Sequence, residues 1–290
     1  MSYRVSNLDI RNSNLMYIEV GPACIAVSGD KGGRAFEFEK EKLEGFVRDI
    51  LQDVSECLPL LRQKAYRIKQ TAFLPEVAKK MVEAVKIVDE ATLTPMAAIA
   101  GAVADALKER CRSEELNFIS INNGGDISIG NQRGRTFRVG LGDINRSAAT
   151  PYVLRIAGMT DCGIASSGFG GRSLTLGLAD IVTVVADTGA IADAAATFVC
   201  NNTNAEGACV VRRRAFEIDP LTDIPEELVT ISIGEINKEV VTKALDSGLS
   251  CAHRLKKLNT IHEAAIVLKG NIVTTIEQGR NIRMEVRNGD

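Results

Sequence analysis

The chain has 290 residues, enough for one large domain or two modest ones, and 45% of them are hydrophobic, so it can bury a sizeable core. Aromatic residues make up only 4% and tryptophan is absent, which predicts an aliphatic core. The formal net charge of -2 gives no electrostatic reason to expect nucleic acid or an anionic membrane as a partner. Two histidines are too few for a histidine-rich metal site.

The cysteines and the N-terminal sequence favour a soluble cytoplasmic protein. The seven cysteines stand singly and no C-x-x-C pair occurs, which is typical of reduced thiols and not of a disulfide framework. The first residues, MSYRVSNLDI, do not have the basic and apolar pattern of a secretory signal. The longest nearly apolar stretch, over 95–107, contains Asp105 and is too short to span a bilayer.

The spacing of the hydrophobic residues changes within the first third of the chain. Residues 3–38 alternate as strands do, with a hairpin turn expected at Gly32–Gly33. Apolar residues three or four apart over 43–58 predict an amphipathic helix, and Pro75 is expected to open a second one. Thr94–Pro95 predicts the N-cap and first position of a third helix, whose alanine-rich sequence lets a backbone or a ligand come close.

The rest of the chain is predicted to be mostly β structure. Strands are expected at 118–122, 127–129, 136–141, 152–156, 181–186, 228–233, 264–268 and 272–276. A helix over 236–245 is expected to stop at Gly248, and the three arginines at 212–214 are expected in a solvated loop. Because strands outnumber helices and hairpins mix with long helices, the predicted fold class is α+β. We expect one compact domain over residues 1–290, with a division into two lobes left open.

The stretch from Gly163 to Thr197 predicts a ligand site. Its glycines let backbone amides approach a ligand, and with one guanidinium these amides would form an anion cradle. The residues expected in the cradle are Ser166, Ser167, Gly168, Gly170, Gly171, Arg172 and Ser173. On the small-residue helix that follows, Asp193 and Thr197 stand one turn apart, and a carboxylate beside a hydroxyl suits a cation held against phosphate. A flexible loop and a helix-surface pair are the simpler alternatives.

A second glycine turn follows the strand predicted at 118–122. Its sequence N-N-G-G-D, formed by Asn122, Asn123, Gly124, Gly125 and Asp126, either only reverses the chain or contributes to the same ligand site. Cys162 is either a buried small thiol or a reactive one whose pKa the neighbouring amides lower. Ser166 is not expected to be a covalent nucleophile, because no histidine lies near it in sequence.

Three motifs occur in a fixed order along the chain. They are T-P-M-A-A-I-A-G-A-V-A-D-A-L over 94–107, I-N-N-G-G-D-I over 121–127, and the S-S-G sequence at 166–168 with A-D-A-A-A-T over 192–197. This series resembles the ApbE superfamily, whose best-known members are magnesium-dependent FAD:protein FMN transferases, and it is most similar to a branch of short ApbE-like proteins without a lipoprotein signal. The resemblance implies an α+β fold with an internally duplicated βαββ arrangement, described as T-fold-like.

The resemblance also implies a set of ligands. In the flavin transferases a metal ion lies against the FAD pyrophosphate. The residues that match its ligands are Asp193 and Thr197, together with the backbone carbonyl of Ala100. The N-x-G-G-D motif lies near the flavin in that family and matches Asn122 and Gly124–Asp126 here. The implied cofactors are therefore magnesium and a flavin nucleotide, FAD or FMN.

Two departures from the family pattern separate this chain from the transferases. The lysine of their I-A-K-G motif is missing, since Gly101 follows Ala100 directly. Their H-x-x-D-P-x-T-G motif has no match over 169–191, and I-D-P-L-T-D at 218–223 comes too late in the chain and is expected to be a proline turn. FMN transfer to a threonine is therefore not expected.

The leading hypothesis is a protein that binds a phosphate-bearing small molecule with magnesium. Its reaction, if it has one, would be a magnesium-dependent transfer or cleavage at a pyrophosphate. The alternative is an accessory or metabolic protein that keeps the fold without flavin chemistry, since some members of the branch are associated with sulfur assimilation and homocysteine formation. Small-residue helices and a rich β content would suit a homodimer.

Overall fold

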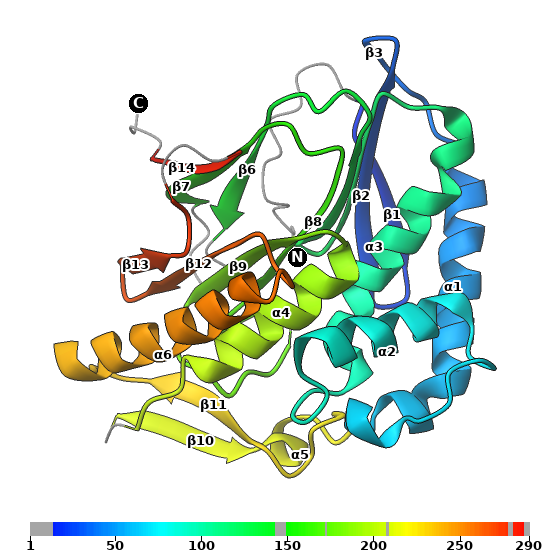
Figure 1. Ribbon diagram of the computed structural model, residues 1–290. Helices are drawn as coiled ribbons and strands as arrows, with labels where there is room; N and C mark the ends of the chain where they lie inside the picture. The colour runs from blue at the N-terminus through cyan, green and yellow to red at the C-terminus, as the bar shows by residue number, and fades with distance from the viewer. Residues whose placement is uncertain (1–13, 143–148, 172, 207–208, 278–280, 287–290) are drawn as a thin grey trace.

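The computed structural model describes residues 14–142, 149–171, 173–206, 209–277 and 281–286 (Figure 1). Its centre is an antiparallel sheet in the order β1-β2-β4-β5-β8-β9-β12-β13, with β3 paired to β2. These strands are β1 (Met16–Val20), β2 (Ala23–Lys31), β3 (Arg34–Ala35), β4 (Phe118–Asn123), β5 (Asp126–Asn131), β8 (Asp161–Ser167), β9 (Ile181–Ala186), β12 (Glu263–Leu268) and β13 (Asn271–Thr274).

Helices cover one face of this sheet and a smaller sheet covers the other (Figure 1). The helices are α1 (Lys40–Leu61), α2 (Glu76–Asp89), α3 (Ile99–Arg110), α4 (Gly189–Asn202), α5 (Ala215–Ile218) and α6 (Lys238–Lys257), with the short 3₁₀ turns η1 (Ala65–Arg67), η2 (Pro95–Ala98) and η3 (Arg112–Glu114). The smaller sheet has the order β14-β7-β6, from β14 (Ile282–Val286), β7 (Ala149–Ile156) and β6 (Phe137–Gly142). A separate pair joins β10 (Val210–Arg214) to β11 (Leu228–Ile233).

Side-chain alternation along the central strands fills two apolar clusters. Ile121, Ala165 and Val184 point toward the helices, whereas Ile127 and Ile164 point toward the smaller sheet. Helix α4 lies deepest among the helices, with seven of its alanine, glycine and valine residues, one phenylalanine and one cysteine buried, as expected for a helix that is apolar on nearly every side. The α+β class predicted from the sequence is confirmed.

Helix α3 starts later than predicted. Residues 95–98 form a 3₁₀ turn and the α-helix begins at Ile99. Thr94 does not cap this turn, because its hydroxyl donates to the Asp223 carboxylate, which comes from the I-D-P-L-T-D segment. Thr94 therefore stands at the predicted N-cap position before Pro95, but its side chain does not cap the turn. The side chain instead ties the start of the helical layer to a turn far along the sequence.

Two other predictions fail for identifiable reasons. Gly248 does not end a helix but lies buried inside α6, where a Cβ atom would stand 2.6 Å from Cγ2 of Thr203. Glycine is therefore used there for close packing. The arginines at 212–214 form part of β10 and not a loop, and Arg214 pairs with Glu226 at 2.6 Å. Paired charges on an outlying strand produce no apolar alternation that could be detected in the sequence.

Candidate functional site

Helices α3 and α4 meet backbone to backbone at Gly101 and Gly189. A Cβ atom on Gly101 would lie 2.1 Å from the carbonyl oxygen of Gly189, and one on Gly189 would lie 2.8 Å from the carbonyl oxygen of Gly101. Real Cβ atoms do not come this close to other atoms, so both positions require glycine. The contact brings the first turns of α3 and α4 together on the helix-covered face of the central sheet (Figure 1).

Asp193 joins this crossing from α4. Its Oδ2 accepts a hydrogen bond from the Gly101 amide at 3.0 Å. Next to it, the carbonyl oxygen of Ala100 accepts a hydrogen bond from Nδ2 of Asn123 at 3.2 Å. The start of α3 is thus linked both to α4 and to the end of β4, and the structure brings Asp193, Ala100 and Asn123 into one neighbourhood.

Asp126 completes this group from the other side of the glycine turn. Since Ile127 and Ile129 face the smaller sheet, Asp126 and Ser128 on the same strand face the helices. Oδ1 of Asp126 accepts a hydrogen bond from the Ser166 amide at 3.3 Å. We define the acidic group as Ala100, Asn123, Asp126 and Asp193; the Ser166 amide lies at its border.

The electrostatics of the acidic group are unusual. Desolvation by burial is the main cause that raises the pKa of the Asp193 carboxyl well above its usual range, and the negative charges of Asp126 and Asp105 raise it further. Hydrogen bonds from the backbone amides of Gly101 and Ala100 oppose this shift. The charged form of the Asp193 carboxyl is therefore disfavoured unless a proton or a cation neutralises it.

Asp105 is the residue of this region whose role the sequence did not reveal. It is buried on α3 and accepts hydrogen bonds from the amides of Gly189 and Ala190, both at 2.9 Å. It also accepts one from the Ser128 hydroxyl at 2.5 Å. The available signal was a lone aspartate on an alanine-rich helix, which predicts a buried acid but not its partners.

Not all residues of the first glycine turn face the acidic group. Asn122 alternates with Asn123 and points away from the helices, where its Oδ1 accepts from the Gly125 amide at 2.8 Å. Gly124 and Gly125 have φ angles of 68° and 115°, so they supply the left-handed backbone of the turn. Asn122 and the two glycines thus shape the turn that carries Asn123 and Asp126.

The predicted anion cradle is divided among several environments. Ser166 and Ser167 belong to the end of strand β8 and not to a loop. The Ser166 hydroxyl lies 2.8 Å from that of Thr183, and Ser167 hydrogen-bonds with the Cys200 thiol. The two hydroxyls therefore have partners inside the protein, and only the Ser166 amide reaches the acidic group.

The glycine-rich segment after β8 is held against the segment before β9. The Phe169 amide donates to the Ala179 carbonyl at 2.8 Å, and a Cβ atom on Gly168 would lie 2.2 Å from the carbonyl oxygen of Asp180. Gly170 and Ser173 are exposed, and Gly171 donates to Gly168 at 3.1 Å. The described hydrogen bonds of these glycines do not reach Asp193. Arg172 lies outside the described residues.

Two further candidates have clear surroundings. Thr197 is half-buried one turn beyond Asp193 on α4. Cys162 is fully buried against the smaller sheet, and burial raises the pKa of its thiol to about 12. Cys162 is therefore the buried small thiol of the two alternatives, because a neutral thiol is a poor nucleophile.

Within the described ranges, no three histidine, cysteine, aspartate or glutamate side chains gather in an arrangement that could hold a metal ion. Nor does any helix in these ranges combine the length and apolar character needed to cross a membrane.

Comparison with known proteins bears on this geometry. The family model described as AbpE bacteria matches residues 11–274. A UPF0280 protein of Methanopyrus kandleri is 35% identical over 159 residues, which are 54% of this chain and 62% of that protein. A UPF0280 protein of Methanospirillum hungatei is 38% identical over 141 residues, covering 48% of this chain and 56% of that protein. The chain thus spans about three fifths of the length of these curated relatives.

One solved structure supports the fold. The flavin transferase ApbE from Vibrio cholerae superposes with a TM-score of 0.50 over 91% of this chain and 97% of that one, at 9% sequence identity. Such a low identity supports the architecture alone. Because the family model covers nearly the whole chain, the chain belongs to the AbpE bacteria family, a member of the ApbE-like superfamily.

Proposed function

We propose that the chain binds a divalent cation, preferably magnesium, at the acidic group, and through it a phosphate-bearing small molecule of the flavin nucleotide class. The observation that carries the proposal is the position of Asp193. Asp193 lies at the crossing of two helices. Burial and the charge of Asp126 raise the pKa of its carboxyl, and no basic side chain is among the groups that shift this pKa. A bound cation would relieve this accumulation of negative charge.

The donor chemistry of the acidic group fits magnesium. Magnesium prefers oxygen ligands, takes one or two carboxylates from a protein and leaves the remaining positions to water and phosphate. Asp193 and Asp126 would supply the carboxylates, while the Ala100 carbonyl and the Thr197 hydroxyl are neutral oxygens from the same two helices. When bound, the ion would hold phosphate oxygens and neutralise charge that develops on them.

The flavin part of the proposal is supported by the fold and by the family. The Vibrio cholerae protein with the same architecture is a flavin transferase by its title. In this chain the turn that carries Asn123 and Asp126 would lie beside such a ligand. The half-exposed end of β8 would border it, with the Ser166 amide already directed at Asp126.

One observation favours a second candidate function, an accessory or metabolic role without FMN transfer. Where the I-A-K-G motif of the transferases has its lysine, this chain runs from Ala100 directly to Gly101, where even a Cβ atom would lie 2.1 Å from the Gly189 carbonyl oxygen. A lysine at this position would require the two helices to separate. We therefore propose binding, or chemistry at a pyrophosphate, and not transfer of FMN to a protein.

Titration calorimetry with the full chain tests the proposal. Mn²⁺ replaces magnesium, and each titration is done with and without FAD. We expect Mn²⁺ and FAD to bind more tightly together than separately, because the ion bridges carboxylate and phosphate. Asp193→Asn and Asp126→Asn should each weaken Mn²⁺ binding at least about tenfold.

Asp246→Asn is the matched control, since it removes the same charge from an exposed position on α6. It should leave binding unchanged. Equal Mn²⁺ affinity in wild type and Asp193→Asn would remove the cation site from the proposal. Chromatography of the FAD samples for FMN and AMP distinguishes cleavage from binding alone.

A further inference from the structure

The two helices that cross at the acidic group carry nearly the same six-residue sequence near their starts. Residues 101–106 read G-A-V-A-D-A and residues 189–194 read G-A-I-A-D-A. Each copy lies in the first turns of its helix, α3 or α4. The two glycines are the points of closest approach. The two aspartates, Asp105 and Asp193, each follow their glycine by one helical turn.

Each of these aspartates accepts hydrogen bonds from backbone amides of the other helix. Asp105 of α3 accepts from the Gly189 and Ala190 amides of α4. Asp193 of α4 accepts from the Gly101 amide of α3. The first amides of a helix have no carbonyl partner within it, so each aspartate satisfies the free amides of the other helix. We call this arrangement the reciprocal clamp.

The two halves of the clamp differ in what surrounds them. Both carboxylate oxygens of Asp105 are bonded to amides, and the Ser128 hydroxyl adds a third donor, so this half is closed. Asp193 is half-buried and close enough to Asp126 to feel its charge, so this half is the one left open to a ligand. Ser128 and Asp126 stand two positions apart on β5; Ser128 donates to Asp105, and the charge of Asp126 acts on Asp193.

We propose that Asp105 is a positioning residue that sets the place of Asp193 in the site. By fixing the first turn of α4 against α3, Asp105 holds Asp193 within reach of the Gly101 amide and beside Asp126. Its occupation of the Gly189 and Ala190 amides also closes the start of α4 to phosphate. The part that concerns cation binding depends on the proposed function, whereas the part that concerns geometry does not.

The Gly101 amide is the reporter for this geometry, because its partner is Asp193 and not Asp105. In Asp105→Asn, an NH₂ group replaces one acceptor oxygen and faces an amide donor of α4. We expect hydrogen exchange at Gly101, followed by NMR on the full chain, to become at least about tenfold faster, while amides of β12 keep their wild-type rates. Mn²⁺ affinity should fall at least about tenfold in the same variant.

Lys108→Met is the matched control, since Lys108 is a buried polar residue of α3 that contacts Asp161 and the Ile129 carbonyl and not α4. It should leave exchange at Gly101 within about twofold of wild type. If Asp105→Asn does not fold, Ser128→Ala removes only the third donor to Asp105. It should then speed exchange at Gly101 severalfold.

Wild-type exchange at Gly101 in folded Asp105→Asn, or in Ser128→Ala where the first variant is unfolded, would overturn the proposal. A rate of hydrogen exchange at Gly101 that rises as much in Lys108→Met as in Asp105→Asn would also overturn it. A wild-type protein that binds no Mn²⁺ would remove the proposed function. The Gly101 measurement would still decide on the clamp.

Discussion

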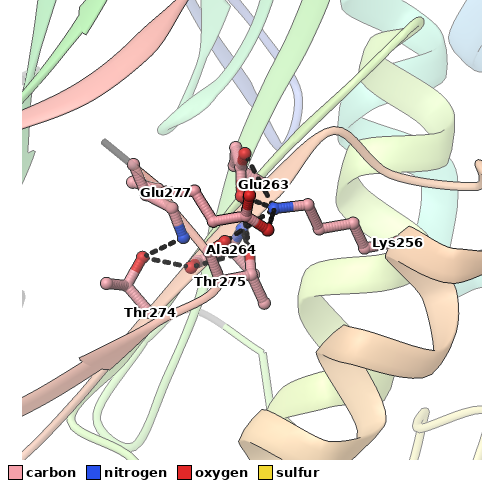
Figure 2. Close-up of polar contacts among 7 residues, drawn as sticks. Lys256, Glu263, Ala264, Thr274, Thr275 and Glu277 are labelled. Atoms are coloured by element: carbon pink, nitrogen blue, oxygen red, sulfur yellow. Dashed lines mark hydrogen bonds and ion pairs between the residues drawn. The ribbon is translucent and has the colours of Figure 1, made fainter. Parts of the chain in front are cut away.

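Glu263 and Asp193 are both carboxylates at the border of the hydrophobic core, but their surroundings are opposite. Figure 2 shows Lys256 reaching from α6 to Glu263, where its Nζ lies 2.9 Å and 2.8 Å from the two carboxylate oxygens. Nζ also donates to the Thr275 carbonyl, and the Thr275 hydroxyl donates to Glu263 at 2.7 Å. Asp193 has amide donors but is next to other acids.

This difference distinguishes a carboxylate that stabilises the fold, Glu263, from one that is a candidate for binding a ligand, Asp193. Glu263 is only 3% exposed, and a lysine supplied by the same chain compensates its charge. Buried charges are tolerated when they are paired and hydrogen-bonded. Among the described residues, no basic side chain shifts the pKa of Asp193 or compensates its charge in this way. The proposed cation would supply this counter-charge.

The largest expected effect in this comparison comes from Glu263→Gln. The substitution leaves Lys256 buried and without its main partner, so it should lower the free energy of unfolding by about 3–5 kcal/mol. Urea unfolding followed by circular dichroism measures this. Glu277→Gln is the control, because Glu277 lies 3.6 Å from the same lysine but is 61% exposed, and it should cost less than about 1 kcal/mol.

A somewhat smaller loss is expected where the two helices meet. Gly101→Ala places a Cβ atom 2.1 Å from the Gly189 carbonyl oxygen and should destabilise the protein by about 2–3 kcal/mol, because backbone must move. Gly45→Ala is the matched control within α1, where no atom lies within 4 Å of the new Cβ. There, alanine should be neutral or stabilise by up to about 1 kcal/mol. Equal melting temperatures for both variants would contradict the close contact.

Asp193→Asn sharpens the comparison, because the same chemical change as in Glu263→Gln should hardly affect folding. An asparagine oxygen can still accept from Gly101, and the repulsion from Asp126 disappears. We expect a change in the free energy of unfolding of less than about 1 kcal/mol, in either direction, without added cation. A loss as large as that of Glu263→Gln would mean that Asp193 is a structural carboxylate too.

The smallest effect at neutral pH is expected for Cys162, a third buried acidic group. Burial raises the pKa of its thiol from 9.0 to about 12. Between these values the unfolded chain loses the proton and the folded protein keeps it, so stability should fall as pH rises from about 9 to about 12. At pH 7 both states are protonated and the thiol contributes no pH dependence.

Urea unfolding at pH 8 and pH 10 measures this alkaline loss. Cys162→Ala should make the loss smaller, although the lost packing lowers stability at both pH values. Cys209→Ala, at an exposed position, should leave the difference between the two pH values as in wild type. An equal alkaline loss in all three proteins would contradict the assignment to Cys162.

The sequence predicted most elements because their hydrophobic period is strong. The helix expected from 43–58 is α1, and the strand expected at 181–186 has the bounds of β9. The N-N-G-G-D turn connects β4 and β5 as its glycines suggest. What failed, such as the helix stop at Gly248, failed because a glycine that permits close packing resembles a glycine that ends a helix.

The candidate site was harder to predict than the fold. The A-D-A-A-A-T and N-N-G-G-D motifs contain Asp193, Asn123 and Asp126, which the structure brings together. The sequence alone does not tell which face of a strand a polar residue occupies when neighbours on both sides are buried, so its pattern groups Asn122 and the Ser166 side chain with them. Asp105 was missed because its partners are backbone amides, which leave no trace in the residue types.

The helix crossing also sets the order in which the protein can assemble. Gly101 and Asp193, which it joins, stand 92 residues apart in the chain. Contacts of such long range form late, because a long loop must close first. During translation, α3 and the β4–β5 hairpin can therefore leave the ribosome and pair while the acidic group is still unmade. Until α4 emerges, the nascent chain therefore exposes the face of α3 that α4 will later cover.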